Sequence, residues 1–176
     1  MNAAIRRLIH DLDCLPAGGG LEELFRAVKA NRIAASDVAE HVRFDPAHYH
    51  RESVVKTDTY QMLALAWLPG QRSPIHNHRG SQCCVRVLRG TAVETVFTPT
   101  RDGFFETRID RHDAGSVLGG EDADIHVVEN AASADIGLVT MHIYRPALTR
   151  MELFEVRNNR LVVVSPTISR LSSTSR

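Results

Sequence analysis

The chain has 176 residues, of which 43% are hydrophobic and 24% are charged, as in a globular protein with one substantial core. Its 21 basic and 21 acidic side chains balance, so no net charge attracts nucleic acid or anionic lipid. No apolar run approaches the roughly 20 residues that span a bilayer, and the N-terminus does not read as a signal peptide. We therefore expect a cytoplasmic protein with neither nucleic acid nor a membrane as partner, and its oligomeric state is left open.

The first quarter of the chain reads as helical. Apolar residues recur at three- and four-residue spacing over 2–12 and 20–30, on either side of the breaker "PAGGG". A third short helix, over 36–44, opens on Ser36 and stops before Asp45-Pro46. We expect residues 1–45 to form a helical cap packed on the rest of the molecule.

After Pro46 the sequence changes to short apolar runs separated by turn residues, which is typical of an all-β sandwich or barrel. This sheet region spans 46–166, and a polar tail, 167–176, follows it within one structural domain. The expected strands lie at 52–58, 60–67, 83–90, 92–99, 104–110, 115–120, 124–130, 136–144, 151–157 and 160–165.

Three cysteines, Cys14, Cys83 and Cys84, make an odd count. Adjacent residues point to opposite faces of a strand, so Cys83 and Cys84 are poor partners for each other. The sequence predicts no disulfide framework, and each cysteine is expected to be a small buried hydrophobe.

Two histidines one residue apart, His76 and His78, precede the run at 83–90. Residues two apart share one face of a strand, and two imidazoles on one face can bind one transition-metal ion. Such a pair is weak evidence for a metal site by itself, because it can equally lie on a polar surface or in the core.

The spacing around this pair carries more information. Residues 70–90 read G-x5-H-x-H-x4-C-x6-G, which resembles the first motif of the cupin superfamily with Cys83 in place of its glutamate. His126 and Asn130 match the H-x3-N part of the second motif, but its preceding Pro-x-Gly is absent, with Glu121 and Ala123 at those places. The resemblance implies a mainly β fold, a cupin-type, jelly-roll-like β-barrel with an N-terminal helical cap.

The cupin resemblance also implies a metal site. His76, His78 and His126 would then share one metal ion without a protein carboxylate. Three neutral imidazoles leave a divalent ion with its full charge, so we expect an anionic donor, a thiolate or a carboxylate, from the substrate.

Two further alternating elements extend the resemblance. "YHR" places Tyr49 and Arg51 on one face if the segment is extended, and "TMHIY" does the same for Thr140, His142 and Tyr144. With the two histidine motifs, this pattern over residues 49–154 resembles the cysteine dioxygenase type I family of thiol dioxygenases.

The family resemblance implies a role for each matching residue. Ferrous iron, Fe(2+), would be held by the three histidines, and Arg51 would clamp the substrate carboxylate beside Tyr49, which lines the pocket. Tyr144 would sit next to the iron, oriented by His142, which Thr140 would steer in turn. Cys83 matches the cysteine that in animal members forms a thioether with the active-site tyrosine, so a Cys83–Tyr144 bond is possible.

Some positions depart from the family pattern. Thr140 replaces a serine, which keeps the hydroxyl, and "RPA" at 145–147 replaces Ser-Pro-Pro. The serine–proline bond is typically cis in relatives, and the sequence leaves open whether the Arg145–Pro146 bond is cis as well. If the Arg145 side chain entered the pocket, it would favour a dianionic thiol over cysteine.

The resemblance implies an enzyme that adds both atoms of O2 to the sulfur of a small carboxylate-bearing thiol, with L-cysteine giving cysteine sulfinate. Three alternatives remain open: 3-mercaptopropionate or mercaptosuccinate as the thiol, a different metal-dependent cupin enzyme, and a non-catalytic module that binds a small thiol. Arg51 could instead pair with Glu52 or Asp58 on a solvated face.

The remaining histidines are expected in helices or turns and have no matching partners for a metal site, so we expect them at the surface. They are His10, His41, His48, His50 and His112.

Overall fold

The computed structural model describes residues 1–165. Three helical elements come first: α1 (Ala3–Asp13), α2 (Leu21–Ala30) and the 3-10 helix η1 (Ala35–His41). Helix α1 begins after Asn2, whose side chain accepts a hydrogen bond from the backbone N–H of Ile5 at 3.0 Å, as an N-cap does. The third helix, expected over 36–44, is confirmed as η1, but it is a 3-10 helix rather than an α-helix.

Eleven strands follow up to residue 165, and all the pairings between these strands are antiparallel. One sheet has the order β1-β2-β9-β4-β7 and the other β11-β10-β3-β8-β5-β6. The strands are β1 (His50–Lys56), β2 (Gln61–Trp67), β3 (Ile75–His76), β4 (Gln82–Arg89), β5 (Thr91–Pro99), β6 (Phe105–Asp113), β7 (Val117–Gly120), β8 (Ile125–Glu129), β9 (Leu138–Arg145), β10 (Leu153–Arg157) and β11 (Arg160–Ser165).

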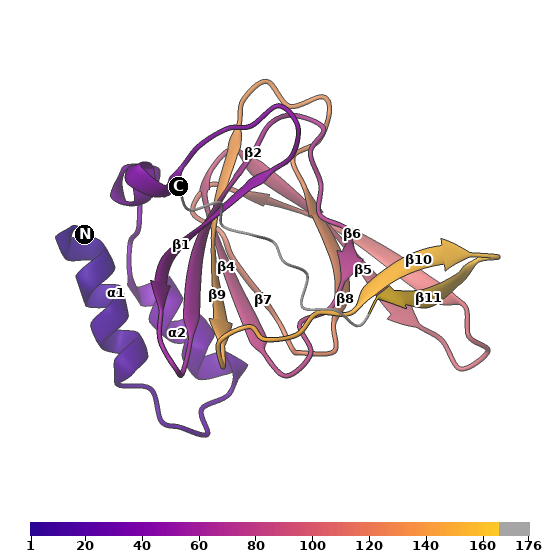
Figure 1. Ribbon diagram of the computed structural model, residues 1–176, viewed down its shortest axis with the longest axis horizontal. Coiled ribbons are helices and arrows are strands. Elements are labelled where there is room, and N and C mark those ends of the chain that lie inside the picture. The colour runs from indigo at the N-terminus through magenta and orange to yellow at the C-terminus, as the bar shows by residue number, and fades with distance from the viewer. Residues whose placement is uncertain (166–176) are drawn as a thin grey trace.

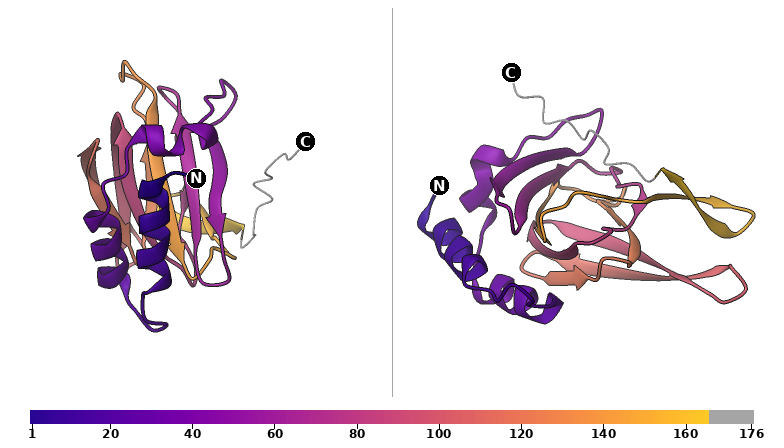
Figure 2. Two further views of the ribbon diagram at one scale, coloured as in Figure 1. Left: turned by 90° about the vertical axis from the view of Figure 1, so that its left-hand side faces the viewer. Right: turned by 60° about the horizontal axis from the view of Figure 1, so that its bottom comes forward.

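The two sheets face each other as the walls of a barrel, and the helices cover the outer face of the five-stranded sheet (Figures 1 and 2). Adjacent residues of β4 divide between the two apolar layers that result. Cys84 packs with Leu24 and Val28 of α2 between the cap and the sheet, whereas Cys83 packs with Leu65 inside the barrel. The expected opposite orientation of the two cysteines is therefore confirmed, and all three cysteines are free.

Arginine side chains fasten the cap to this sheet. Arg86 of β4 donates to the backbone carbonyl of Val28 at 3.2 Å, in the last turn of α2, where carbonyls lack helical partners. Arg145, at the end of β9, donates to the carbonyls of Leu15 and Pro16 at 3.3 and 2.6 Å. Since Arg145 follows Tyr144 on the strand, it points to the opposite face, toward the loop between α1 and α2.

Several expectations need correction. Cys14 is exposed rather than buried, because it follows α1 on its solvent side. His41, His50 and His112 are half-buried rather than at the surface, and the last two lie in β1 and β6, not in turns. His10 and His48 are exposed as expected. The Arg145–Pro146 bond, which the sequence left open, is cis. The tail at 167–176 lies outside the described residues.

None of the helices in the described part of the chain has the length and apolar character needed to cross a membrane.

Candidate metal centre and adjoining pocket

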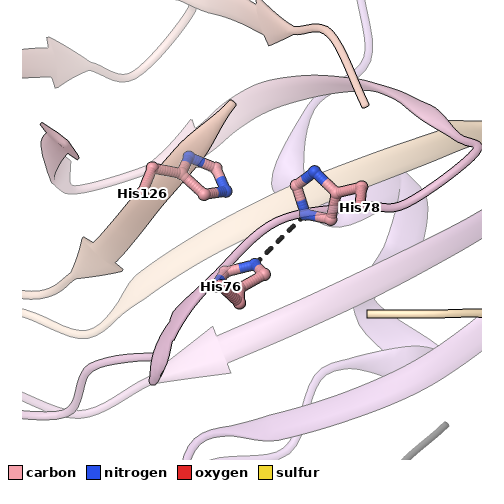
Figure 3. A group of neighbouring side chains, drawn as sticks. All are labelled: His76, His78 and His126. Atoms are coloured by element: carbon pink, nitrogen blue, oxygen red, sulfur yellow. Dashed lines mark hydrogen bonds between the residues drawn. The ribbon is translucent and has the colours of Figure 1, made fainter. Parts of the chain in front are cut away.

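Three histidines converge inside the barrel. His76 of β3 and His126 of β8 are direct partners across two antiparallel strands, which brings their rings to a centroid distance of 4.7 Å. His78 lies after the end of β3, so the expected strand alternation does not place it. The backbone turn does: its Nε2 lies 3.1 Å from Nε2 of His76 (Figure 3).

The nitrogen atoms of this group are arranged for metal binding. One ligand atom from each histidine lies within 4.8 Å of the others, and all three residues are buried. Nδ1 of His76 is 2.9 Å from the carbonyl oxygen of Pro74, and Nδ1 of His126 is 2.6 Å from a carboxylate oxygen of Glu94. Each of these Nδ1 atoms therefore carries the proton, which leaves the Nε2 lone pair free.

The buried Nε2 of His126 has no hydrogen-bond partner among the described residues. A buried acceptor without a partner is unfavourable, and a shared cation would satisfy it together with the facing Nε2 atoms of His76 and His78. The residues present therefore fit a transition-metal ion with imidazole ligands.

The electrostatics keep these imidazoles neutral. Burial, followed by the neighbouring His126, lowers the pKa of His76 to about 3. Burial and the adjacent His76 also lower the pKa of His78 well below its usual range. At neutral pH both rings are therefore uncharged, with one ring nitrogen free of a proton, as a metal ligand requires.

A chain of polar side chains runs along β9 beside the histidines. The Tyr144 hydroxyl lies 3.4 Å from Nδ1 of His142, and Nε2 of His142 lies 3.0 Å from the Thr140 hydroxyl. Nε1 of Trp67 donates to the same hydroxyl at 3.0 Å. Burial raises the pKa of Tyr144 and lowers that of His142, so both groups are neutral at pH 7.

Cys83 and Tyr144 are direct partners across β4 and β9. Their side chains therefore share the interior face of the five-stranded sheet, and Tyr144 packs against His78 with ring centroids 5.1 Å apart. Burial raises the pKa of the Cys83 thiol well above its usual range, so it is a neutral thiol.

The strand register places Arg51 on the same interior face. Arg51 pairs with Leu65, Leu65 pairs with Thr140, and paired residues share one face of a sheet. After burial, the charge of Arg51 is the largest cause that lowers the pKa of His142. Within residues 1–165 no ion pair joins Arg51 to Glu52 or Asp58.

Tyr49 lies just before β1 and stacks on Trp67, with ring centroids 4.1 Å apart. Asn130, from the second motif, is no ligand: its Nδ2 donates to the carbonyls of Trp67 and Ile136 at 3.1 and 3.0 Å. It therefore connects the end of β2 to the segment before β9.

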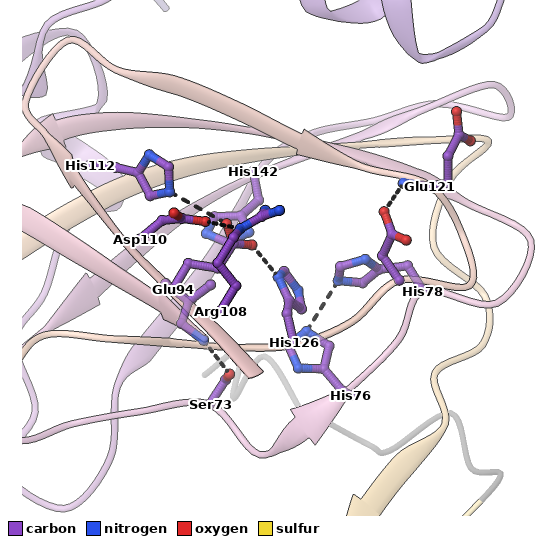
Figure 4. A network of polar contacts seen from close by, with 12 residues as sticks. Ser73, His76, His78, Glu94, Arg108, Asp110, His112, Glu121, His126 and His142 are labelled. Carbon is purple, nitrogen blue, oxygen red and sulfur yellow. Dashed lines mark hydrogen bonds and ion pairs between the residues drawn. The ribbon is translucent and has the colours of Figure 1, made fainter. Parts of the chain in front are cut away.

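The structure also brings in residues that the sequence reasoning missed. Glu94, in the run "AVETV", contacts His126 across β5 and β8, and His112 lies beyond it (Figure 4). Trp67 holds Thr140. The sequence alternation shows that Glu94 shares one face of its strand with residues 92 and 96. Only the register between β5 and β8 shows that this face brings Glu94 to His126.

Arg145 does not reach the histidines. It lines a separate cavity of about 460 Å³ between the α1–α2 loop and the end of the barrel, together with Gly19, Gln82, Glu121 and Pro146. The interpretation that Arg145 selects a dianionic thiol loses its basis, because this guanidinium is bound to carbonyls of the cap.

The barrel and its three-histidine face are those of a cupin with a candidate metal centre. Two solved structures share this fold. A protein with a double-stranded β-helix domain from Klebsiella pneumoniae has a TM-score of 0.56 at 20% identity, over 70% of this chain and 97% of that one. TT1209 from Thermus thermophilus has a TM-score of 0.53 at 20% identity, over 63% and 95% of the two chains.

The sequence comparison is more specific. The family described as cysteine dioxygenase type I matches residues 18–157, so the chain belongs to that family. Cysteine dioxygenase type 1 of Homo sapiens is 26% identical over 163 residues, 88% of this chain and 79% of that protein. The Rattus norvegicus protein is 24% identical over the same shares. The protein is accordingly an oxidoreductase of the thiol dioxygenase class, from a family of metalloenzymes.

Proposed function

We propose that the protein uses ferrous iron, Fe(2+), to add both atoms of O2 to the sulfur of L-cysteine, which gives cysteine sulfinate. The observation that carries this proposal is the convergence of three buried Nε2 atoms, from His76, His78 and His126, on the side of the barrel interior that Arg51 and Tyr144 face.

The reaction balances without a further reductant. A thiol and O2 combine to a sulfinic acid, the second step of thiol oxidation, in which the sulfur loses four electrons and O2 gains four. Held by His76, His78 and His126, Fe(2+) would supply the redox chemistry that lets the thiolate and O2 exchange these electrons. The buried imidazoles of His76 and His78 are neutral, so they leave the charge of the ion for an anionic sulfur to balance.

Arg51 binds the carboxylate of the substrate. Its planar guanidinium matches two carboxylate oxygens with two parallel hydrogen bonds, which sets the orientation of the molecule as well as its affinity. The lack of an ion pair with Glu52 or Asp58 among the described residues supports this role, because the guanidinium is then available to an incoming anion. Tyr49, stacked on Trp67, forms an aromatic wall near it.

Tyr144 donates a hydrogen bond to the reacting molecules. Trp67 donates to the Thr140 hydroxyl, and that hydroxyl then donates to Nε2 of His142. His142 carries its proton on Nδ1, which faces the Tyr144 oxygen. The phenol proton is thereby free to point at the substrate side, and Thr140 and His142 act as positioning residues.

Cys83 is the partner of Tyr144 in a thioether bond. The support for this bond is their direct opposition across β4 and β9, which places opposed Cβ atoms about 4.5 to 5.5 Å apart. The bond would remove one conformational freedom from Tyr144. A cytoplasmic location completes the proposal, since three free thiols persist in a reducing compartment.

The experiment is O2 uptake by protein that has been reconstituted anaerobically with Fe(2+). Cysteine, 3-mercaptopropionate and mercaptosuccinate are supplied in turn, and the sulfinate product is quantified. We expect one sulfinate for each O2 consumed with cysteine, and little uptake with mercaptosuccinate, because Arg145 is bound to the cap. Uptake with 3-mercaptopropionate alone would contradict the choice of thiol, and cysteine binding without uptake would indicate a binding module instead.

A matched control separates substrate binding from metal binding. Arg51→Gln keeps a hydrogen-bonding side chain and removes the charge, whereas His126→Gln removes a metal ligand. We expect the first variant to retain iron with a raised KM, and the second to lose iron. Zinc or manganese as the sole active ion would favour a different cupin enzyme.

A further inference from the structure

Glu94 is an almost enclosed carboxylate next to the metal centre, with a side chain that is 14% exposed. One oxygen lies 2.6 Å from Nδ1 of His126, and the other lies 3.4 Å from Nε2 of His112 (Figure 4). The carboxylate thus bridges a histidine of the candidate metal centre and a histidine that is not part of it.

The strand register explains this arrangement. Val96 of β5 is the direct partner of His126 in β8, and Glu94 precedes Val96 by two residues, so it faces His126 diagonally. Ala92 precedes Glu94 by two residues and is the direct partner of His112 in β6. All of these side chains therefore share one face of the six-stranded sheet.

We propose that Glu94 is a positioning residue of the metal centre, which holds His126 with its proton on Nδ1. His112 lies beside the second carboxylate oxygen, but its Nε2 has no hydrogen-bond partner among the described residues. This inference rests on the proposed metal centre but not on thiol oxidation. Its physical reason is that an anionic acceptor on Nδ1 fixes the ring orientation and increases electron donation from Nε2 to a cation.

The position of this charge has a consequence for the cupin motif. Cys83 stands where the motif has a glutamate, and its thiol is neutral. Glu94 supplies a carboxylate that would not bind the ion directly but acts through its hydrogen bond to Nδ1 of His126. A bound ion would therefore keep its open positions, and the His126 imidazole would pass part of the negative charge to it.

The neighbouring carboxylate, Asp110, does not share this role. It is the strand partner of Glu94, but its Oδ2 is bound to Nε of Arg108 at 2.7 Å. Asp110 therefore offers a control that removes one negative charge from the same patch and leaves the contact between Glu94 and His126 in place.

The first test reads the histidine tautomer in metal-free protein. Nitrogen-15 NMR distinguishes the protonated from the unprotonated ring nitrogen, and the His126 signals are assigned by their loss in His126→Gln. We expect Nδ1 protonation in the wild type and in Glu94→Gln, which keeps an acceptor oxygen, and a mixture of tautomers in Glu94→Ala. An unchanged tautomer in Glu94→Ala would overturn the proposal.

The second test measures Co(II) affinity by competition with a chelator, without substrate or O2. We expect Glu94→Gln to weaken binding by about 10- to 100-fold, as removal of such outer partners does, and Asp110→Asn to change it by less than about 3-fold.

Equal losses in Glu94→Gln and Asp110→Asn would reduce the effect to net charge and overturn the inference. Thermal unfolding of each metal-free variant shows that the binding change is not a folding defect. If wild-type protein binds Co(II) with this dependence on Glu94 but oxidises no thiol, the proposed function fails and this inference stands.

Discussion

Thr140 is the point at which the polar chain of β9 can be tested most sharply. Its side chain has no exposed surface, and its hydroxyl lies 3.0 Å from both Trp67 Nε1 and His142 Nε2. Thr140→Val replaces that hydroxyl with a methyl group of nearly the same size. The substitution therefore removes two hydrogen bonds without opening a cavity.

The size of the effect follows from the two groups left without a partner. A buried donor or acceptor that loses its partner costs about 1 to 3 kcal/mol. The added methyl group returns about 0.8 kcal/mol of apolar burial. We expect the free energy of unfolding to fall by about 1 to 5 kcal/mol, which lowers the Tm by about 2 to 20 °C in a chain of this length.

The assay is urea unfolding of metal-free Thr140→Val beside Thr140→Ser. Serine keeps the hydroxyl and loses one methyl group, so its free energy of unfolding should fall by only about 1 kcal/mol. Turnover should follow the same order, because only valine releases His142 from its orientation. Thr140→Val within about 0.5 kcal/mol of the wild type would refute the view that this hydroxyl joins Trp67 to His142.

Three other predictions concern single side chains. Tyr144→Phe should keep iron, measured by metal analysis, and lose turnover by about 10²- to 10³-fold, as expected for loss of one hydrogen-bond donor to the reacting molecules; full turnover would contradict its role. Mass spectrometry of aerobically turned-over wild-type protein should show a mass two hydrogen atoms below that calculated from the sequence, because the Cys83–Tyr144 bond removes them. Cys83→Ser should have its calculated mass. A wild-type protein at its full calculated mass would exclude the bond. Burial and then the Asp13 carboxylate raise the pKa of Tyr60 to about 12. The folded state holds the phenol proton more tightly than the unfolded state, so Tyr60 contributes about 1 to 2 kcal/mol to the free energy of unfolding after solvent screening at exposed Asp13. This contribution is present below pH 10 and is lost as the pH rises toward 12. Tyr60→Phe should remove this part of the pH dependence of urea unfolding.

The strand pattern predicted most of the fold because each strand has one apolar face or two. β9 is buried along its whole length, and its sequence alternates Thr140, His142 and Tyr144 on the interior face. The same alternation already places Arg145 on the other face. The placement of Arg145, which the sequence analysis left open, could therefore have been decided from the sequence: residues 144 and 145 cannot share a face of one strand.

Other parts of the site could not be read from the sequence. His78 follows a strand of only two residues, so its position depends on a turn, and its backbone N–H donates to the carbonyl of Asp122 at 3.1 Å. Glu94 reaches His126 because β5 and β8 pair with a particular register. Spacing within one segment carries no information about register between segments 30 residues apart.

The two sheets divide the chemistry between them. The six-stranded sheet carries His76 on β3, His126 on β8 and the outer carboxylate of Glu94 on β5. The five-stranded sheet carries Arg51 on β1, and Thr140, His142 and Tyr144 on β9.

This division makes the helical cap relevant to one side of the site more than the other. The cap packs on the five-stranded sheet, and Arg86 and Arg145 bind its backbone carbonyls from β4 and β9. The same two strands carry Cys83 and Tyr144 on their interior face. A change in how the cap seats should therefore move the groups that face the substrate while leaving the pairing of β3 with β8, and with it the spacing of His76 and His126, unchanged.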